Sequence, residues 1–200
     1  MANEMRTYVT VKSDEPAVAK RLQEIFKSRR GTWEVDALDV INNLEGTSYF
    51  YSNEKEGFDK DLNFPSNDLW ESIIGPKWMN VEYDHSDLPE NCNIVLSSAW
   101  HVPTAFLERL RDELQKIDED CYIKGTYEDE SYDPCGAFVY GKFEYEDMED
   151  YDDVYDWDAA DEDDFYNETW VESLNDLSTD LEVAYIEYLE DIKENPDLYE

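Results

Sequence analysis

The feature that most constrains this chain is the uneven distribution of its charge. Residues 143–200 contain 24 Asp and Glu residues but one basic residue, Lys193, so these 58 residues have a net charge of −23. The whole chain has a net charge of −36, from 52 acidic and 16 basic residues. Proteins that bind nucleic acids or anionic lipids do so through Lys and Arg clusters. The sequence therefore predicts no direct contact with nucleic acid or membrane, and a basic protein surface as the partner.

High net charge favours disorder, but the apolar content of this chain, 41% hydrophobic and 14% aromatic, favours a folded core. We interpret residues 1–142 as an α+β domain with an irregular insert near residues 31–68. Residues 143–200 form an acidic, aromatic-rich segment followed by an amphipathic helix. No apolar stretch is long enough for a membrane span, and the first residues do not resemble a signal peptide. We therefore expect a cytoplasmic protein.

The hydrophobic pattern of residues 1–142 predicts five strands and three helices. Strands are expected at 6–12, 78–83, 91–99, 121–126 and 137–144. Helices are expected from Pro16 towards Gly31, around residues 35–44, and from Pro103 to Ile117. The order is βα, an irregular insert, then ββαββ. Two βαβ units on one antiparallel sheet, with the helices on one face, make the split βαβ or ferredoxin-like arrangement.

Three short motifs in this domain also resemble a known family. They are Gly75-Pro76-Lys77-Trp78, then Ser98-Ala99-Trp100-His101-Val102-Pro103, and Tyr127 followed by Cys135-Gly136-x-Phe138. They are similar to motifs of the YubB ferredoxin-like family, which occurs on plasmids, in phages and in bacterial genomes. The resemblance covers roughly residues 70–142, although Pro76 stands where that family usually has Thr and residues 126–138 are more acidic and differently spaced. It implies a ferredoxin-like fold and a mobile-element origin. It implies no catalytic residue, because the family has no established chemistry.

The sequence contains none of the common catalytic or nucleotide-binding motifs, so we expect no enzymatic activity and no cofactor. His101 could act as a base, but packing at a strand-to-helix turn is the simpler interpretation. Trp78 and Trp100 are expected to fill the volume between sheet and helix. Three cysteines without a C-x-x-C pair predict buried thiols rather than a zinc site. Asp59-x-Asp61-x-Asn63 begins like a calcium-binding loop but has Phe64 where the loop requires Gly, so we expect no specific metal site.

The segment from Glu144 to Trp170 combines acidic and aromatic residues in a way that a solvated tail does not need. Because aromatic rings favour burial, the segment is expected to dock on its own domain or on a partner. We predict that its acidic and aromatic side chains bind the partner. The predicted partner-binding residues are Glu144, Glu146, Asp147, Glu149, Asp150, Asp152, Asp153, Asp156, Asp158, Asp161, Glu162, Asp163, Asp164, Tyr151, Tyr155 and Trp157.

Downstream, apolar residues repeat at helical spacing, which predicts one long helix or two short ones broken near Ser178. The expected apolar stripe consists of Trp170, Leu174, Leu177, Leu181, Ala184, Tyr188 and Ile192. It would pack on the same chain or on a second copy in a homodimer. The expected polar face consists of Glu172, Asp176, Asp180, Glu187, Glu190, Asp191 and Glu194.

An ordered acidic surface with few cations opposes folding, because like charges repel. A function is expected to offset that cost. Carboxylates three or four residues apart on a helix lie about 5–6 Å apart, which suits the occupation of a basic groove that normally holds DNA. With the mobile-element resemblance, this favours a phage- or plasmid-type DNA mimic that inhibits a host defence or nucleic-acid-handling protein in the bacterial cytoplasm. The alternative is an acidic assembly module that binds a basic partner without mimicking DNA.

Overall fold

The computed structural model describes residues 3–27, 34–45, 58–59, 64–65, 72–76, 78–131, 134–149 and 168–196. Within these residues the fold is α+β, as expected, and is built on one antiparallel sheet in the order β2-β5-β6-β1-β7-β8-β9. The strands of this sheet are β1 (Glu4–Lys12), β2 (Glu34–Asp36), β5 (Met79–Asp84), β6 (Asn93–Ala99), β7 (Tyr122–Asp129), β8 (Cys135–Tyr140) and β9 (Glu144–Glu149). A separate pair consists of β3 (Phe58–Asp59) and β4 (Phe64–Pro65). The helices are α1 (Pro16–Ile25), α2 (Ala37–Glu45), η1 (Pro89–Asn91), α4 (Thr104–Leu114) and α6 (Glu168–Glu194).

The main core lies between one face of the sheet and helices α1, α2 and α4. Along β1, Met5, Val9 and Val11 are buried, whereas Arg6 and Tyr8, which point to the other face, are exposed. This alternation follows from the two-residue period of a strand. The buried face of β1 packs in one cluster with apolar residues of all three helices.

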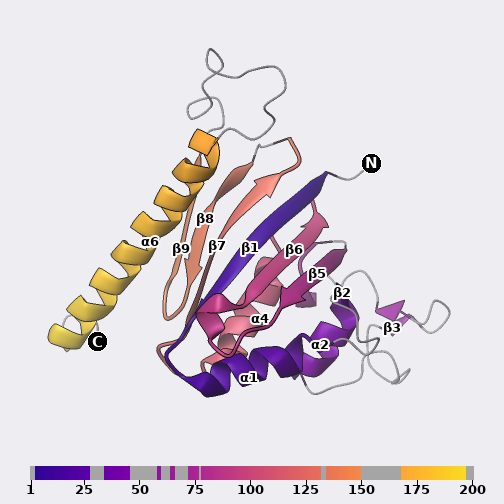
Figure 1. The fold of residues 1–200 in the computed structure, drawn as a ribbon, viewed down its shortest axis with the longest axis horizontal. Helices are drawn as coiled ribbons and strands as arrows, with labels where there is room; N and C mark the ends of the chain where they lie inside the picture. Colours follow the sequence, from indigo (N-terminus) through magenta and orange to yellow (C-terminus); the bar gives the residue numbers. More distant parts are fainter. Residues whose placement is uncertain are drawn as a thin grey trace, which may run out of the picture.

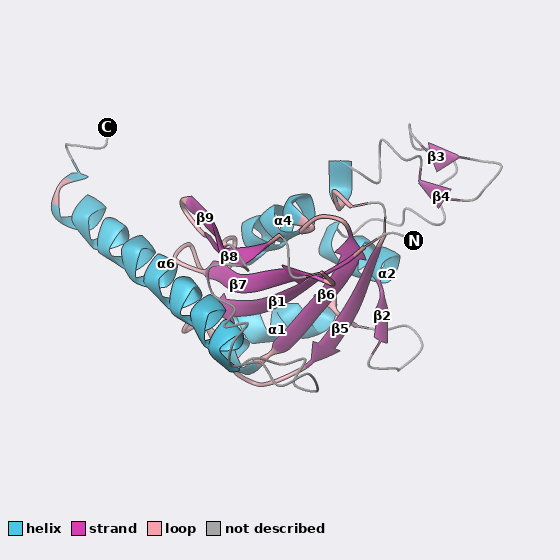
Figure 2. Cartoon of the chain, turned by 90° about the horizontal axis from the view of Figure 1, so that it is seen from above, coloured by secondary structure: helices cyan, strands magenta, loops and turns pink. Residues whose placement is uncertain are grey.

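Helix α6 packs on the opposite face of the sheet, over β7, β8 and β9 (Figure 1). The face can be assigned because Tyr122 and Lys124 of β7 contact α6, whereas Ile123 between them belongs to the core beneath α1 and α4. Both faces of β8 are therefore covered, and all six of its residues are buried. The C-terminal end of α6 extends past the edge of the sheet (Figure 2).

Several expected boundaries differ from the structure. The single strand expected at 137–144 is wrong, because a turn at residues 141–143 divides it into β8 and the start of β9. Ile117 was expected on the apolar face of a helix, but it follows the end of α4 and is exposed. α6 is one unbroken helix, which decides between the two alternatives for the C-terminus. β9 and α6 belong to residues 143–200, which we described from the sequence as an acidic segment following the α+β domain. Both elements contact β8 of that domain.

None of the described helices combines the length and the apolar composition that a membrane crossing requires.

Candidate functional site

The candidate site is the outer surface of α6, and its geometry depends on how the inner surface is held. Tyr185 is fully buried, and its ring centroid lies 5.0 Å from that of Tyr122. The backbone N–H of Lys142 donates a 3.0 Å hydrogen bond to the Tyr185 hydroxyl. Farther along the helix, the ring of Tyr188 meets that of Phe143 edge to face, at 4.5 Å. These contacts fix both the position and the rotation of α6 on the sheet.

A glycine provides the space for the Tyr185 ring. Gly141 lies in the turn between β8 and β9, and a Cβ atom at this position would overlap the Tyr185 hydroxyl and its ring. The glycine is required here by close approach, because its φ is not in the left-handed region. Any larger residue at 141 must therefore displace Tyr185, and with it the middle of α6.

A polar network also connects α6 to β7. The Tyr122 hydroxyl and the Lys124 ammonium donate hydrogen bonds of 2.7 Å and 2.6 Å to the two carboxylate oxygens of Glu182. Burial alone would raise the pKa of Glu182, but the hydrogen bonds from Lys124 and Tyr122 outweigh it, so this pKa lies below its ordinary value. Burial and the nearby Glu182 carboxylate raise the pKa of Tyr122. Glu182 is thus a structural carboxylate, although it lies on the most acidic helix.

The outer surface of α6 carries a row of carboxylates that we call the α6 acidic stripe. Its members are all exposed and lie on the side of the helix opposite to Tyr185, because at about 100° per residue each is at least about 120° around the helix axis from that residue. They are Glu172, Asp176, Asp180, Glu187, Glu190, Asp191 and Glu194. The sequence-based prediction of this polar face is confirmed. At 1.5 Å per residue the stripe is about 33 Å long.

The apolar stripe of α6 was predicted less accurately. Leu174 is buried as expected, but Ala184 is exposed and Tyr185 takes its place against the sheet. Leu177 and Leu181 are half-buried, and Ser178 is buried between them. Nothing in the spacing of the sequence distinguishes Ala184 from Tyr185, because neighbouring helical positions differ by only about 100° and both residues can border an apolar face.

The structure describes few of the partner-binding residues predicted from the sequence. Glu144, Glu146 and Asp147 lie on β9, and the backbone of Glu149 ends this strand. The Glu144 carboxylate lies 2.6 Å from the Arg111 guanidinium, and Glu146 accepts a 3.1 Å hydrogen bond from Tyr140. The remaining predicted residues lie outside the described part of the chain: Asp150, Tyr151, Asp152, Asp153, Tyr155, Asp156, Trp157, Asp158, Asp161, Glu162, Asp163 and Asp164.

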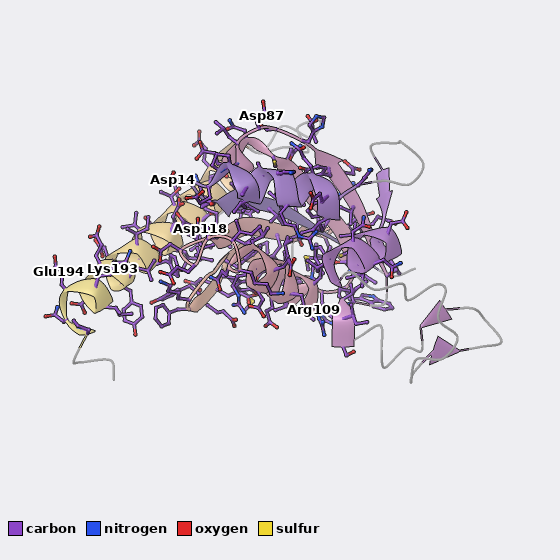
Figure 3. The ribbon with its side chains drawn as sticks, turned by 90° about the horizontal axis from the view of Figure 1, so that it is seen from below. Asp14, Asp87, Arg109, Asp118, Lys193 and Glu194 are labelled. Atoms are coloured by element: carbon purple, nitrogen blue, oxygen red, sulfur yellow. The ribbon has the colours of Figure 1, made fainter. Side chains whose placement is uncertain are left out.

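Several acidic residues outside the α6 acidic stripe are paired with cations. Arg21 lies 2.7 Å and Lys116 2.6 Å from the carboxylate of Glu113. Burial would raise the pKa of Glu113, but hydrogen bonds from Lys116 and Arg21 lower it. Asp120 lies 2.7 Å from Lys142 and 3.5 Å from Lys193, the basic residue near the C-terminal end of α6 (Figure 3). Lys193 thus pairs with the loop before β7 rather than with the stripe.

Cys121 and His101 lie outside the α6 acidic stripe and carry side chains of types that can take part in catalysis. Burial and the nearby Asp118 raise the pKa of the Cys121 thiol to about 12, which disfavours the reactive thiolate. His101 is exposed, and its backbone carbonyl accepts a 2.7 Å hydrogen bond from the Ser98 hydroxyl. Among the described residues, no group of three or more His, Cys, Asp or Glu side chains is arranged to hold a metal ion.

The expectation that Trp100 fills the core is wrong. Trp78 is half-buried, but Trp100 is 44% exposed at the end of β6. Trp100 has a φ of +63°, in the left-handed region, which interrupts the alternation of the strand. Sequence reasoning missed this because a Trp after a buried strand normally continues the core pattern.

No family model, curated protein or solved structure matches this chain. The fold and the site define the chain as an acidic α+β protein in which a helix packs on the sheet and exposes a row of carboxylates. The resemblance to the YubB ferredoxin-like family stays an expectation from the sequence motifs.

Proposed function

We propose that this protein is a non-enzymatic DNA mimic that inhibits a basic, nucleic-acid-handling protein. The observation that carries the proposal is the α6 acidic stripe, which presents seven exposed carboxylates over about 33 Å. One strand of B-form DNA presents about ten phosphates over that length, so the stripe has about seven-tenths of the charge density of one strand. A basic groove that accepts DNA would therefore meet a comparable row of negative charges.

The way in which α6 is docked supports this function. A flexible acidic tail loses conformational freedom when it binds, and this entropy loss weakens binding. In α6 the rotation of the helix is already set by Tyr185 and by the Glu182–Lys124 pair. The helix therefore presents its carboxylates in one direction before it meets a partner. Electrostatic attraction over this length also accelerates association with a basic protein.

The proposal also includes a ferredoxin-like topology for the sheet. The strand order β5-β6-β1-β7, with α1 following β1 and α4 connecting β6 to β7, supports a split βαβ or ferredoxin-like core. In this interpretation β8, β9 and α6 are additions at one side of that core, and β2 is an addition at the other. The motifs shared with the YubB ferredoxin-like family support the same assignment, a phage or plasmid origin, and action in the bacterial host cytoplasm.

The alternative is an assembly module that binds a basic protein without occupying its DNA site. The same stripe supports this alternative, because an exposed acidic surface attracts basic surfaces of any shape. The two functions differ in whether the partner can bind duplex DNA at the same time.

The test begins with isolation of the partner from a bacterial host lysate on the immobilised full-length protein. The purified partner is then bound to wild-type protein, and duplex DNA is added at fixed ionic strength. A DNA mimic should be displaced, because two anionic ligands cannot share one groove. A complex that holds both ligands at once would reject mimicry and favour the assembly module.

A charge-matched pair of variants shows which surface binds. The stripe variant carries Asp176→Asn, Asp180→Asn, Glu187→Gln and Glu190→Gln. The control variant carries Glu82→Gln, Asp84→Asn, Asp87→Asn and Glu90→Gln, all exposed positions around the β5–β6 connection. Figure 3 shows Asp87 far from the end of α6 marked by Lys193 and Glu194. Both variants lose four charges, so the proposal expects the stripe variant alone to bind much more weakly.

A further inference from the structure

Trp100 is the residue whose conformation the fold explains least. Among the described residues it is the non-glycine residue with a positive φ, +63°. A bulky side chain is strongly disfavoured in this region, because its Cβ approaches the neighbouring carbonyl oxygen. Gly or Asn would adopt the same backbone with less strain. A tryptophan at position 100 is therefore unfavourable for the backbone conformation found there.

The backbone around Trp100 is held firmly in this conformation. The Trp100 N–H donates a 3.1 Å hydrogen bond to the carbonyl of Asn3, and the His101 N–H donates a 2.8 Å bond to the carbonyl of Ala99. The Ser98 hydroxyl donates to the carbonyl of His101 at 2.7 Å. The turn is thus defined by its backbone bonds, which a glycine at position 100 would retain.

Much of the ring also remains at the surface, because the Trp100 side chain is 44% exposed. An exposed aromatic side chain on a strained backbone is a common feature of binding sites, where strain is maintained for function. The two observations together indicate that the indole ring is kept at the surface to contact a partner.

The surroundings of Trp100 indicate the charge of that partner. Asn3, which accepts the Trp100 bond, also donates to the carboxylate of Asp129. The neighbouring Glu4 accepts a backbone bond from the exposed Glu130. β9 ends and α6 begins at the same end of the strands at which β6 ends (Figure 1). Trp100 therefore lies at the end of the sheet where the acidic helix α6 begins and where Glu130 is exposed.

We propose that Trp100 binds an arginine side chain of a basic partner, by stacking of the indole ring on the guanidinium group. Trp has the most favourable ring for cation–π contact, and arginine stacks on aromatic faces more readily than lysine does. The net charge of −36 attracts partners rich in these cations. This inference rests on the proposed function only in taking the partner to be basic, and it adds a specific residue and a specific ligand group.

The test uses the full-length protein with two defined probes, an octa-arginine peptide and an octa-lysine peptide. The indole N–H resonance of Trp100 is assigned by its loss in the Trp100→Gly variant. We expect octa-arginine to shift this resonance and to bind the variant about two- to five-fold more weakly than the wild type. Octa-lysine should distinguish the two proteins less. Leu88→Gly, which removes an exposed apolar side chain at the other end of β6, should bind octa-arginine like the wild type.

Equal octa-arginine affinity of wild type and Trp100→Gly, or an unshifted Trp100 resonance, would overturn the inference. The stripe variant in the same assay keeps the inference separate from the proposed function. Weaker binding by the stripe variant with no effect of Trp100→Gly rejects the role of Trp100 and leaves the proposed function standing. Weaker binding by Trp100→Gly with no effect of the stripe variant supports Trp100 and rejects the stripe as the binding surface.

Discussion

The ammonium group of Lys124 on β7 lies 2.6 Å from the carboxylate of Glu182 on α6. The two side chains are only 18% and 16% exposed, so water screens their attraction less than it screens a surface pair. The pair joins the acidic helix to the sheet at the centre of its length. Glu182 thus holds α6 in place, while the carboxylates on the other side of the helix remain exposed.

The first prediction concerns this pair. Glu182→Gln should lower the free energy of unfolding by about 1.5–3 kcal/mol, because it removes charged hydrogen bonds and leaves Lys124 half-buried without its partner. Urea denaturation measures this change. Glu187→Gln is the control, since it removes the same charge from an exposed position of the same helix and should change stability by less than about 0.5 kcal/mol. Equal effects of the two substitutions would contradict a structural role for Glu182.

The second prediction concerns the space beside Tyr185. Gly141→Ala should displace the Tyr185 ring and cost about 1–3 kcal/mol, because the added methyl group overpacks the turn. Hydrogen exchange should show loss of protection in residues 168–196, while β1 and β6 remain protected. Tyr185→Ala should then cost less in the Gly141→Ala protein than in the wild type. Additive costs would show that the two residues do not share one packing site.

The third prediction concerns pH. The pKa of Glu182 is lowered in the folded protein, so its stabilising effect is complete above the ordinary carboxyl pKa and is lost as the pH falls through the lowered value. The difference in unfolding free energy between wild type and Glu182→Gln should therefore shrink towards zero on acidification. Protonation of the exposed carboxylates relieves their repulsion and so stabilises both proteins on acidification. Because this effect is common to the two proteins, it cancels in the difference between them. A difference that stays constant into strong acid would contradict the role of the ionised carboxylate.

The fourth prediction concerns salt. Raising NaCl from about 0.01 M to about 0.5 M should increase the thermal midpoint of the wild type, because the Debye length falls from about 30 Å to below 8 Å and self-repulsion is screened. The stripe variant should have a higher midpoint than the wild type at low salt, and a smaller gain on salt addition. Calorimetry at several salt concentrations measures both effects. A midpoint that does not depend on salt would show that repulsion on α6 is negligible.

The fifth prediction concerns Trp100. Trp100→Gly should be more stable than Trp100→Ala by about 0.5–1 kcal/mol, because both variants lose the indole ring and only glycine relieves the left-handed strain, about 1–2 kcal/mol, against its added chain entropy. Chemical denaturation measures this difference. Leu88→Gly should not be more stable than Leu88→Ala, because residue 88 has an ordinary φ of −111°. A Trp100→Gly protein no more stable than Trp100→Ala would show that the backbone at residue 100 is not strained.

Some elements could be predicted from local pattern because that pattern is repeated along one segment. In α4, Phe106, Leu107 and Leu110 recur at helical spacing, and all three are buried. In β1 the alternation of apolar and polar residues gave the strand and its buried face. The acidic stripe of α6 was also predictable, because its residues and their exposure share one helical period.

Other features depend on segments that are distant in the sequence. β9 is acidic and therefore resembled part of an appendage, but it pairs with β8 and closes that side of the sheet. Strand order likewise depends on backbone hydrogen bonds between residues more than a hundred positions apart, as between β1 and β7. A local pattern contains no information about such partners.

The sequence alone determined that the chain folds, that its C-terminal region is helical and acidic, and that its partner is expected to be basic, because these properties depend on composition and period. Only the tertiary structure decided that Tyr185 rather than Ala184 faces the sheet and that Trp100 is exposed on a strained turn. The physical reason is that these side chains are placed by the space and the hydrogen bonds that distant residues provide. Gly141 leaves room for the Tyr185 ring, and the carbonyl of Asn3 holds the backbone at Trp100.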